Sequence, residues 1–194
     1  MKANDLIILM NVTKADIEGL LVVEPDIFRD DRGYFLESYN SDRYREAGIP
    51  DVFVQDNVSV SKKGVIRGLH YQTPPFAQGK LVSVLRGRVL DVVVDIRTGS
   101  STFGRYVAVE LSAENHRQFW IPAGFAHGFI ALEDDTIFTY KVTNVYDKES
   151  DRGVRWNDPA LGIAWPTEVP PIVSEKDTKL PLLKDIAQEF VWES

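Results

Sequence analysis

Residues 90–97, Leu90-Asp91-Val92-Val93-Val94-Asp95-Ile96-Arg97, indicate the fold more clearly than any other stretch of the chain. Every second side chain from residue 90 onward is apolar, and the alternate positions include Asp91, Asp95 and Arg97. Successive side chains of a β-strand point to opposite faces, and β-branched residues suit that pleated surface. The stretch therefore predicts a strand with one apolar face and one face that is functional or wet.

The neighbouring segments continue the β pattern. Residues 80–85 form a second strand-like run, and Gly87 between two arginines predicts a tight hairpin turn that joins the two strands. Short helices are expected only at 41–47, with Ser41 as N-cap and Gly48 as the stop, and at 182–187. About ten short strands with little helical periodicity predict an all-β sandwich, jelly roll or barrel. The further strand segments are 20–28, 34–39, 53–60, 65–72, 106–111, 118–121 and 136–143.

The segment after residue 156 has a different character, with five prolines between residues 159 and 181 and few alternating runs. Trp156, Trp165 and Trp192 would be costly to expose, so we expect residues 156–194 to form an ordered extension packed on the β core. A chain of 194 residues is close to the length of one domain. Residues 1–194 are therefore predicted to be a single domain.

The composition excludes several classes of function. With 29 acidic and 22 basic residues the net charge is −7, so no broad basic surface is available to bind nucleic acid. The chain has no cysteine, which excludes disulfides, zinc–thiolate sites and thiol nucleophiles. Its N-terminal apolar run, residues 6–10, is far shorter than a membrane span or a signal-peptide core. We therefore expect a cytoplasmic protein that does not contact a membrane.

Three histidines are the first candidates for chemistry: His70, His116 and His127. His70 lies in a strand-like segment, where alternation places it on one face with Gly68 and Gln72. The other face is expected to carry Arg67, Leu69 and Tyr71. A lone histidine on a strand is more often a satisfied core residue than a catalytic one, so a functional role for His70 requires partners.

His127 ends the segment Pro122-Ala123-Gly124-Phe125-Ala126-His127. This spacing is similar to the second motif of cupins, in which a tight turn brings a histidine into the mouth of a jelly-roll barrel, although Pro and Gly also form ordinary turns. The first cupin motif has two histidines one residue apart and a glutamate, and here Gln72 stands where its second histidine would be. Three histidines without a clustered carboxylate suit a transition metal poorly, so a metal-free barrel is predicted.

Two other polar segments have plainer alternatives. Tyr140 and Tyr146 share strand parity, so an extended segment would aim both phenols to one side. Two aromatics on a strand are, however, more often packing residues than catalytic ones. The segment Ser174-Glu175-Lys176-Asp177 would in isolation be interpreted as a solvated turn.

Six motifs occur in one order within residues 22–184: 32–40 (RGYFLESYN), 53–57 (FVQDN), 67–72 (RGLHYQ), 102–104 (TFG), 121–129 (IPAGFAHGF) and 156–159 (WNDP). With these motifs the chain resembles the dTDP-4-dehydrorhamnose 3,5-epimerase family, the dTDP-sugar epimerases of L-rhamnose biosynthesis. The resemblance implies a cupin-type jelly-roll barrel. It also implies a reaction that inverts C3 and C5 of a dTDP-linked 4-keto-6-deoxyhexose without a metal or cofactor.

The resemblance implies four catalytic residues. His70 matches the base that removes a proton beside the C4 ketone, and Asp177 matches the carboxylate that orients it. Tyr140 matches the acid on the opposite face of the sugar, and Lys80 matches the cation that stabilises the enolate oxygen. Such chemistry needs a base, an acid and an electrostatic stabiliser of the developing charge.

The resemblance also implies a set of substrate-binding residues and a homodimer. Tyr146 matches the residue that stacks on thymine, Glu37 is expected to read the thymine edge, and Asp151 stands where the family usually has glutamate. In the family, N-terminal strands cross to the partner subunit, so Arg32 or Glu37 would serve the neighbour's site. The complete set is Arg32, Glu37, Gln55, Asp56, Asn57, Arg67, His127, Tyr146, Asp151 and Lys176.

Three alternatives to this function remain open from the sequence. A relative that inverts only C3 or only C5 would carry similar residues. A cupin that binds a sugar nucleotide without catalysis would be expected to lack His70, Tyr140 or Asp177, all of which are present. A metal-dependent cupin oxygenase would require one stoichiometric iron per chain.

Overall fold

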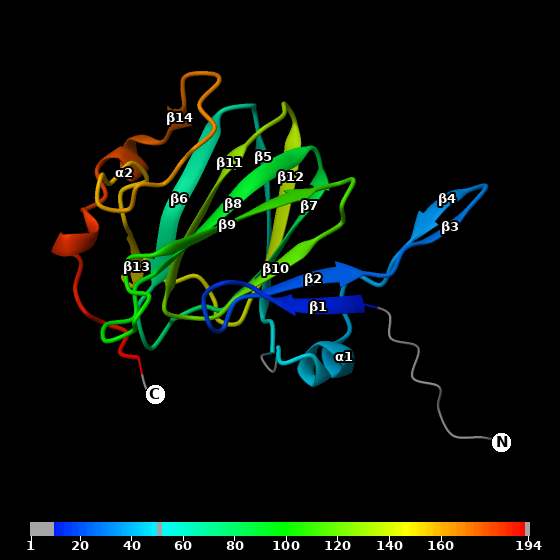
Figure 1. Cartoon of the computed structure of the whole chain (residues 1–194), viewed down its shortest axis with the longest axis horizontal. Helices are drawn as coiled ribbons and strands as arrows, with labels where there is room; N and C mark the ends of the chain where they lie inside the picture. The colour runs from blue at the N-terminus through cyan, green and yellow to red at the C-terminus, as the bar shows by residue number, and fades with distance from the viewer. Residues whose placement is uncertain (1–9, 50–51, 193–194) are drawn as a thin grey trace.

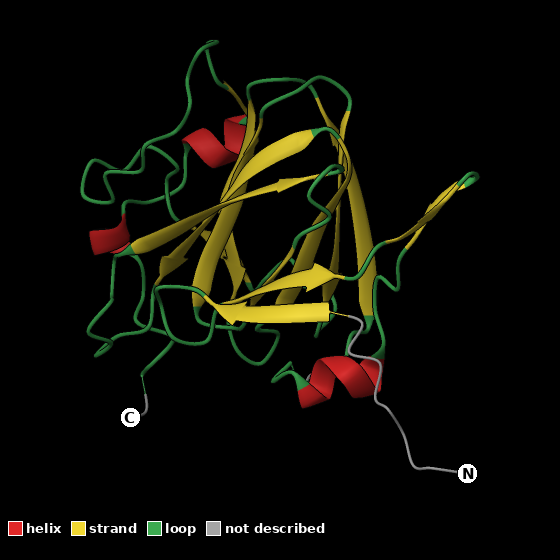
Figure 2. Cartoon of the chain, turned by 45° about the vertical axis from the view of Figure 1, so that its right-hand side comes forward, coloured by secondary structure: helices red, strands yellow, loops and turns green. Residues whose placement is uncertain are grey.

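In the computed structural model, which describes residues 10–49 and 52–192, two sheets face each other and form a jelly-roll barrel (Figures 1 and 2). This confirms the predicted all-β, cupin-type fold. The first sheet contains, in spatial order, β1 (Met10–Lys14), β2 (Leu21–Pro25), β10 (Gln118–Ile121), β7 (Lys80–Arg86), β12 (Thr136–Val142) and β5 (Gln55–Ser61). The second contains β13 (Asp151–Gly153), β6 (Val65–Gln72), β11 (Phe125–Ala131), β8 (Arg88–Asp95) and β9 (Tyr106–Ser112), and β14 (Ile172–Val173) pairs with β6 in parallel.

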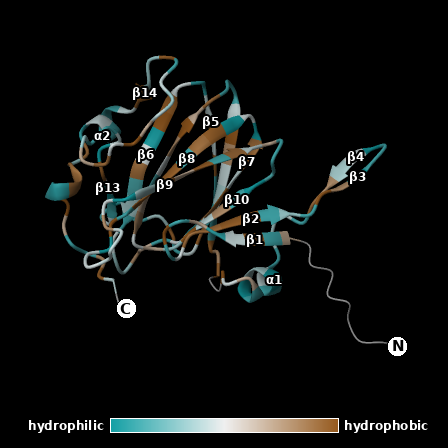
Figure 3. Ribbon diagram, viewed as in Figure 1, coloured by the Kyte–Doolittle hydropathy of each residue, from teal (hydrophilic) through white to brown (hydrophobic). Residues whose placement is uncertain are grey.

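Apolar residues form one cluster between the two sheets, a second on the outer face of the second sheet and a third on part of the outer face of the first. Figure 3 shows that hydrophobic residues concentrate on the strands of the barrel. On β8, Val89 and Val93 point into the barrel, whereas Val92 and Val94 pack outside against the C-terminal segment. Of the two alternatives predicted for the second face of this strand, functional or wet, the wet one is therefore excluded. Asp91, which shares the inward parity of Val89 and Val93, is fully buried.

The hairpin predicted at Gly87 is also wrong. Strand β7 belongs to the first sheet and β8 to the second, so the turn carries the chain from one sheet to the other. Gly87 has a φ of 75°, and a Cβ there would lie 2.5 Å from Oγ1 of Thr136. A glycine is consequently required on both conformational and steric grounds.

Strands β6 and β10 have the predicted bounds, and most of the other predicted strands differ by a few residues at their ends. Strand β11 was expected as a turn motif, but all seven of its residues are buried, so no polar alternation marks it. Segment 34–39 contributes only the end of β4 (Gly33–Phe35), which pairs with β3 (Phe28–Asp30) in a hairpin that projects from the barrel (Figure 1).

The helices are shorter than expected. Helix α1 (Ser41–Glu46) is capped by the side chain of Asn40 rather than by Ser41. The expected helix at 182–187 is a single 3₁₀ turn, Leu183–Asp185. The solvated turn expected at 174–177 is instead helix α2 (Glu175–Thr178), whose N-cap Ser174 accepts a hydrogen bond from the amide of Asp177. None of the helices in the described part of the chain is long and apolar enough to cross a membrane, and the run 6–10 falls almost entirely outside that part.

A bulge in β6 decides which side chains of that strand face the cavity. His127 pairs with His70 and Phe129 pairs with Arg67, so β6 contains one more residue than β11 between the two pairs. A Cβ on Gly128 would lie 2.5 Å from the carbonyl oxygen of Arg67, so the close approach depends on glycine. The extra residue reverses the alternation of inward and outward side chains along β6 between Arg67 and His70. The expectation that Arg67 and His70 face opposite ways is therefore wrong, because both line one cavity.

The C-terminal segment packs on the outer face of the second sheet (Figure 1). Leu161 is buried there against Tyr71 and Val92, and the amide of Leu183 donates to Oδ2 of Asp158 over 2.7 Å. Trp192 stacks on the guanidinium of Arg97, with 4.2 Å between Cζ and the ring centroid. That the chain is one domain with an extension at 156–194 remains a prediction, and these contacts support it.

Candidate active site

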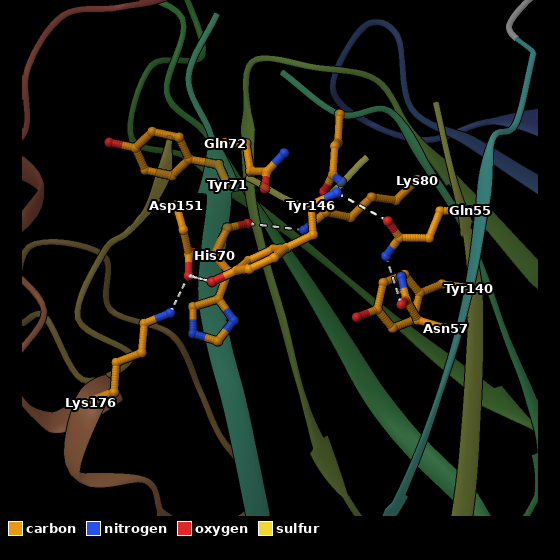
Figure 4. Close-up of a pocket in the computed structure, with 11 residues that line it drawn as sticks. Gln55, Asn57, His70, Tyr71, Gln72, Lys80, Tyr140, Tyr146, Asp151 and Lys176 are labelled. Atoms are coloured by element: carbon orange, nitrogen blue, oxygen red, sulfur yellow. Dashed lines mark hydrogen bonds and ion pairs between the residues drawn. The ribbon is translucent and has the colours of Figure 1, made fainter. Parts of the chain in front are cut away.

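Two adjoining cavities, of about 260 and 560 Å³, lie between the sheets and share His70, Lys80, Tyr140 and Lys176. Figure 4 shows the smaller one, with His70 on β6 and Tyr140 on β12 on opposite sides of it. The larger cavity is additionally lined by Arg67, His127, Asp177 and the apolar side chains of Phe129 and Phe138, among others. A ligand that fills both would therefore meet polar groups at the mouth and aromatic rings deeper inside.

His70 and Asp177 form a hydrogen-bonded pair although 107 residues separate them in the chain. Nε2 of His70 lies 2.7 Å from Oδ1 of Asp177, and Oδ2 of Asp177 accepts a hydrogen bond from the amide of Gly68 over 3.3 Å. The carboxylate is 3% exposed, whereas the side chain of His70 is 32% exposed and faces the cavity. A neutral His70 that donates through Nε2 keeps its lone pair on Nδ1, the nitrogen that remains to act as a base.

Asp177 remains ionised in this setting. Burial alone would raise the pKa of its carboxyl, but the hydrogen bonds and charge of His70, with the amide of Gly68 and the Ser174 cap, outweigh burial and lower the pKa overall.

Tyr140 faces the cavity from the opposite sheet. Burial is the main cause of the raised pKa of its phenol, so the hydroxyl keeps its proton at neutral pH. Among the residues that the structure describes, none forms a hydrogen bond with this hydroxyl. It is therefore available to donate to a molecule bound between the sheets.

Lys80, at the start of β7, brings a positive charge into the barrel. Its side chain is 8% exposed, and Nζ donates a hydrogen bond to the carbonyl of His70 over 3.1 Å. Burial lowers the pKa of this ammonium from 10.5 to about 8, against the opposing charges of Asp91 and Asp151. A cation held at such a cost to stability is typical of a site where negative charge develops.

Lys80→Met is expected to stabilise the protein. The fall in pKa from 10.5 to about 8 corresponds to about 3 kcal/mol of unfavourable burial at pH 7. Because the pKa is lower in the folded state, this penalty is complete below pH 8 and fades as the pH rises towards 10.5. Urea unfolding at pH 7 should therefore give a higher free energy for the methionine variant, and a loss of stability would contradict the assignment of a strained buried charge.

A second histidine–carboxylate pair lies beside the first. His127 on β11 is 7% exposed, and its Nε2 is 2.8 Å from Oδ2 of the fully buried Asp91 on β8. Burial lowers the pKa of His127, and Asp91 only partly offsets this. The sequence pattern predicts that Asp91 lies on a face that is functional or wet but assigns it no role, and the signal that could have found it is an acidic residue within a run of valines.

Residues at the mouth of the smaller cavity form a connected network (Figure 4). The hydroxyl of Tyr146 is 3.1 Å from Oδ2 of Asp151, which also pairs with Nζ of Lys176. Gln55 accepts a hydrogen bond from the amide of Tyr146 over 3.0 Å and donates to Asn57 over 2.9 Å. The network fixes the tyrosine ring at the entrance while leaving it 56% exposed.

Three of the expected substrate-binding residues lie outside these cavities. Asp56 points to the outer face of β5, between Gln55 and Asn57 that point inward, and pairs with Lys141 over 3.0 Å. Arg32, at the tip of the projecting hairpin, pairs with Asp30, and Glu37 pairs with Arg43. Within one chain the structure therefore brings together all the expected residues except Arg32, Glu37 and Asp56. In the part of the chain that is described, no group of three or more His, Cys, Asp or Glu side chains is placed to bind a metal ion.

An imidazole and a phenol on opposite sides of one cavity suit proton transfer at the two faces of a bound molecule, which is the chemistry of an isomerase. Comparison with known proteins agrees, and the chain is an isomerase of the epimerase class. It belongs to the dTDP-4-dehydrorhamnose 3,5-epimerase family, whose model matches residues 14–185. The resemblance inferred from the sequence motifs is thereby confirmed.

Similar proteins cover nearly the whole chain. The dTDP-4-dehydrorhamnose 3,5-epimerase of Shigella flexneri is 54% identical over 169 residues, which are 87% of this chain and 93% of that protein. A 3,5-epimerase from Legionella pneumophila, solved with dTDP-4-keto-L-rhamnose, is 50% identical with a TM-score of 0.92 and coverage of 95% and 100% of the two chains. A relative from Bacillus anthracis, solved with TDP and PPi, is 48% identical with a TM-score of 0.87 over 89% and 99%.

Proposed function

We propose that the protein converts dTDP-4-dehydro-6-deoxy-D-glucose to dTDP-4-dehydro-L-rhamnose by inverting C3 and C5 of the sugar. The observation that carries the proposal is the placement of the His70–Asp177 pair and the Tyr140 phenol on opposite sides of one cavity, with the Lys80 ammonium between the sheets. Membership of the family and the dTDP-sugar bound to the Legionella relative support the same substrate class.

The first step removes a proton from a carbon next to the ketone. C3 and C5 both flank C4, so loss of either proton places the electron pair on the C4 oxygen as an enolate. Nδ1 of His70 takes the proton, and Asp177, 2.7 Å from Nε2, stabilises the resulting imidazolium. The buried Lys80 ammonium stabilises the negative oxygen.

The second step returns a proton to the opposite face. The Tyr140 hydroxyl donates its proton to the same carbon, the enolate collapses to the ketone, and the configuration at that carbon is inverted. Each inversion leaves His70 protonated and Tyr140 ionised, so both groups must exchange protons with solvent before the next one. The product therefore acquires solvent hydrogen at each inverted carbon.

Nucleotide binding is assigned to the mouth of the cavities. The exposed ring of Tyr146 offers a face on which thymine can stack, and Gln55 and Asn57 beside it present amide groups to the base or the sugar. Lys176 and Arg67, which line the cavities, supply positive charge for the diphosphate in a chain of net charge −7. His127 and Asp151 complete the set of proposed contacts. That the protein is cytoplasmic remains a prediction.

We also propose a homodimer that exchanges the β3–β4 hairpin. An isolated two-stranded hairpin is marginally stable, and this one exposes Phe28, Tyr34 and Phe35 by 49%, 54% and 68%. The outer face of the first sheet exposes Val58 and Leu85, by 66% and 63%, so both surfaces are suited to a second copy of the chain. The exchange would bring Arg32 and Glu37 to the partner's cavity.

The dimer is tested by sedimentation equilibrium. The wild-type protein is expected to have twice the mass of one chain, and Phe35→Asp is expected to shift it towards the monomer because a carboxylate cannot be buried unpaired. Phe103→Asp is the control, since Phe103 is an exposed aromatic residue away from the hairpin. A wild-type monomer at micromolar concentration would contradict the exchange.

The product identifies the reaction. Incubation with dTDP-4-dehydro-6-deoxy-D-glucose, followed by NMR of the sugar, is expected to show inverted configuration at both C3 and C5. Inversion at one carbon would indicate a mono-epimerase, and an unchanged sugar that nevertheless binds would indicate a binding protein without catalysis.

A further inference from the structure

Asp91 is a buried carboxylate that the proposed mechanism does not use. It lies in the middle of β8, points into the barrel with Val89 and Val93 on either side, and is 0% exposed. Its Oδ2 is 2.8 Å from Nε2 of His127, while Oδ1 has no hydrogen-bond partner among the described residues. A buried carboxylate with a single hydrogen bond is unfavourable unless positive charge lies nearby, so its presence requires an explanation.

Ionisable groups from several strands lie around Asp91 and the two cavities. His127 is on β11, His70 is on β6 directly opposite it, and Lys80 is on β7. Tyr140 on β12, Asp151 on β13, Arg67 on β6, and Lys176 and Asp177 on α2 line the same cavities, as do Tyr71 and Tyr146. Of the two carboxylates that oppose the loss of the Lys80 proton, Asp91 has the larger effect.

We propose that Asp91 is a positioning residue of this site: its carboxylate selects the tautomer of His127 that carries hydrogen on Nε2, and its charge keeps Lys80 protonated beneath the bound sugar. The proposal rests on the proposed function, because these two effects serve catalysis only if the protein is the proposed epimerase. Asp91 is not among the residues that line the two cavities, so it is proposed to act through His127 and Lys80.

The effect on His127 follows from the hydrogen bond. A carboxylate accepts only, so the nitrogen 2.8 Å away must be the one that carries hydrogen. The other nitrogen, Nδ1, then has a lone pair as long as the ring is neutral, and burial favours the neutral ring by lowering its pKa. His127 is therefore an acceptor that suits a substrate hydroxyl, rather than a cation that suits a phosphate oxygen.

The effect on Lys80 follows from the balance of charges around it. Burial lowers the pKa of Lys80 to about 8, and this value already includes the raising influence of Asp91 and Asp151. Without the negative charge of Asp91 the pKa falls further, and a larger fraction of Lys80 is neutral at neutral pH. A neutral amine stabilises an enolate oxygen less well than an ammonium does.

The experiment compares wild type with Asp91→Asn in the absence of any ligand. NMR titration of the Lys80 Cε resonance is expected to give a midpoint near 8 in the wild type and a midpoint about one pH unit lower or more in the variant. Imidazole ¹⁵N spectra are expected to show hydrogen on Nε2 of His127 in the wild type and a mixture of tautomers in the variant, since an amide can accept or donate.

Asp95→Asn is the matched structural control. Asp95 lies on the same strand, is also 0% exposed, and is paired with Arg97 over 2.8 Å. This variant is expected to lose stability without changing the Lys80 midpoint or the His127 tautomer. The proposal is overturned if neither the Lys80 midpoint nor the His127 tautomer changes in Asp91→Asn. If Asp91→Asn does not fold, the imidazole ¹⁵N spectrum of the wild-type protein tests the proposal. Hydrogen on Nδ1 of His127 in that spectrum would overturn it.

Activity separates this proposal from the proposed function. The alkaline limb of the kcat/KM profile is expected to move to lower pH in Asp91→Asn by the same amount as the Lys80 midpoint. The NMR results need no substrate, so they stand even if the protein does not turn over the dTDP-sugar. A shifted Lys80 midpoint with an unshifted rate profile would overturn the claim that protonated Lys80 serves the reaction.

Discussion

Replacing His70 with alanine is expected to lower deuterium exchange at both C3 and C5 of the sugar by about 10³-fold or more, while dTDP still binds. The reason is that one imidazole, held by Asp177 through Nε2 at 2.7 Å, is assigned to remove the proton from either carbon. Binding persists because the assigned nucleotide contacts are made by other side chains, those of Tyr146, Gln55 and Asn57. NMR of the sugar in D₂O and calorimetric titration with dTDP measure the two properties.

His116→Asn is the matched control for the loss of an imidazole. His116 lies outside both cavities, and its ring packs at a tilt of 54° against that of Tyr34, with 4.7 Å between the ring centroids. Its φ of 53° is one that asparagine tolerates well. The control should keep full exchange. Substantial exchange by His70→Ala at either carbon would show that another base serves that carbon.

Tyr140→Phe is expected to lower the formation of inverted product by about 10²- to 10⁴-fold, the usual range for loss of a general acid, with a much smaller effect on proton removal. His70 still takes the proton and, after exchange with solvent, returns deuterium to the same face. The variant should therefore incorporate deuterium with retention of configuration. Separate measurement of exchange and inversion by NMR distinguishes the two steps.

The control for the phenol is Tyr106→Phe. Tyr106 is on β9, and its oxygen accepts a hydrogen bond from the amide of Ala164 over 3.4 Å, outside the cavities. The Tyr106→Phe variant should keep both deuterium exchange and inversion close to the wild-type values. Equal losses of exchange and inversion in Tyr140→Phe would contradict the role of the phenol as the acid on the opposite face.

Much of the fold could be predicted from local pattern, because a half-buried strand leaves an alternation that can be read directly. The prediction failed where burial removes that alternation. Strand β11 is buried on both faces, and both faces of β8 are covered, so of the two alternatives for the face with Asp91, functional or wet, the wet one is excluded. The hairpin at Gly87 failed for a different reason, since a glycine turn specifies a change of direction but not whether the chain stays in the same sheet.

The site was harder to predict from residues alone. Motif spacing indicated His70 and His127, but their neighbouring positions on β6 and β11 depend on a register that includes a bulge. Asp177 lies 107 residues from His70, in a segment whose composition indicates only a solvated turn, so its role came from family resemblance. The buried pairing of Asp91 with His127 is a tertiary contact that strand pattern by itself does not specify.

The stability of the barrel and the chemistry of its cavity favour different residues. Lys80, Asp91 and Asp177 are all less than 9% exposed, and burial opposes the charged form of each ionised group. Their presence is understandable if each acts on the reacting sugar, directly or through a histidine. The predicted stabilisation by Lys80→Met expresses this conflict in a measurable form.

The central claim is that one base and one acid on opposite sides of the cavity invert both carbons that flank the ketone. The most direct test is to incubate the wild-type protein with dTDP-4-dehydro-6-deoxy-D-glucose in D₂O and to assign the deuterium by NMR, because isotope exchange records each proton removal wherever the equilibrium lies. We expect deuterium at both C3 and C5 and at no other carbon of the ring. Deuterium at one of the two, or at neither, would contradict the account.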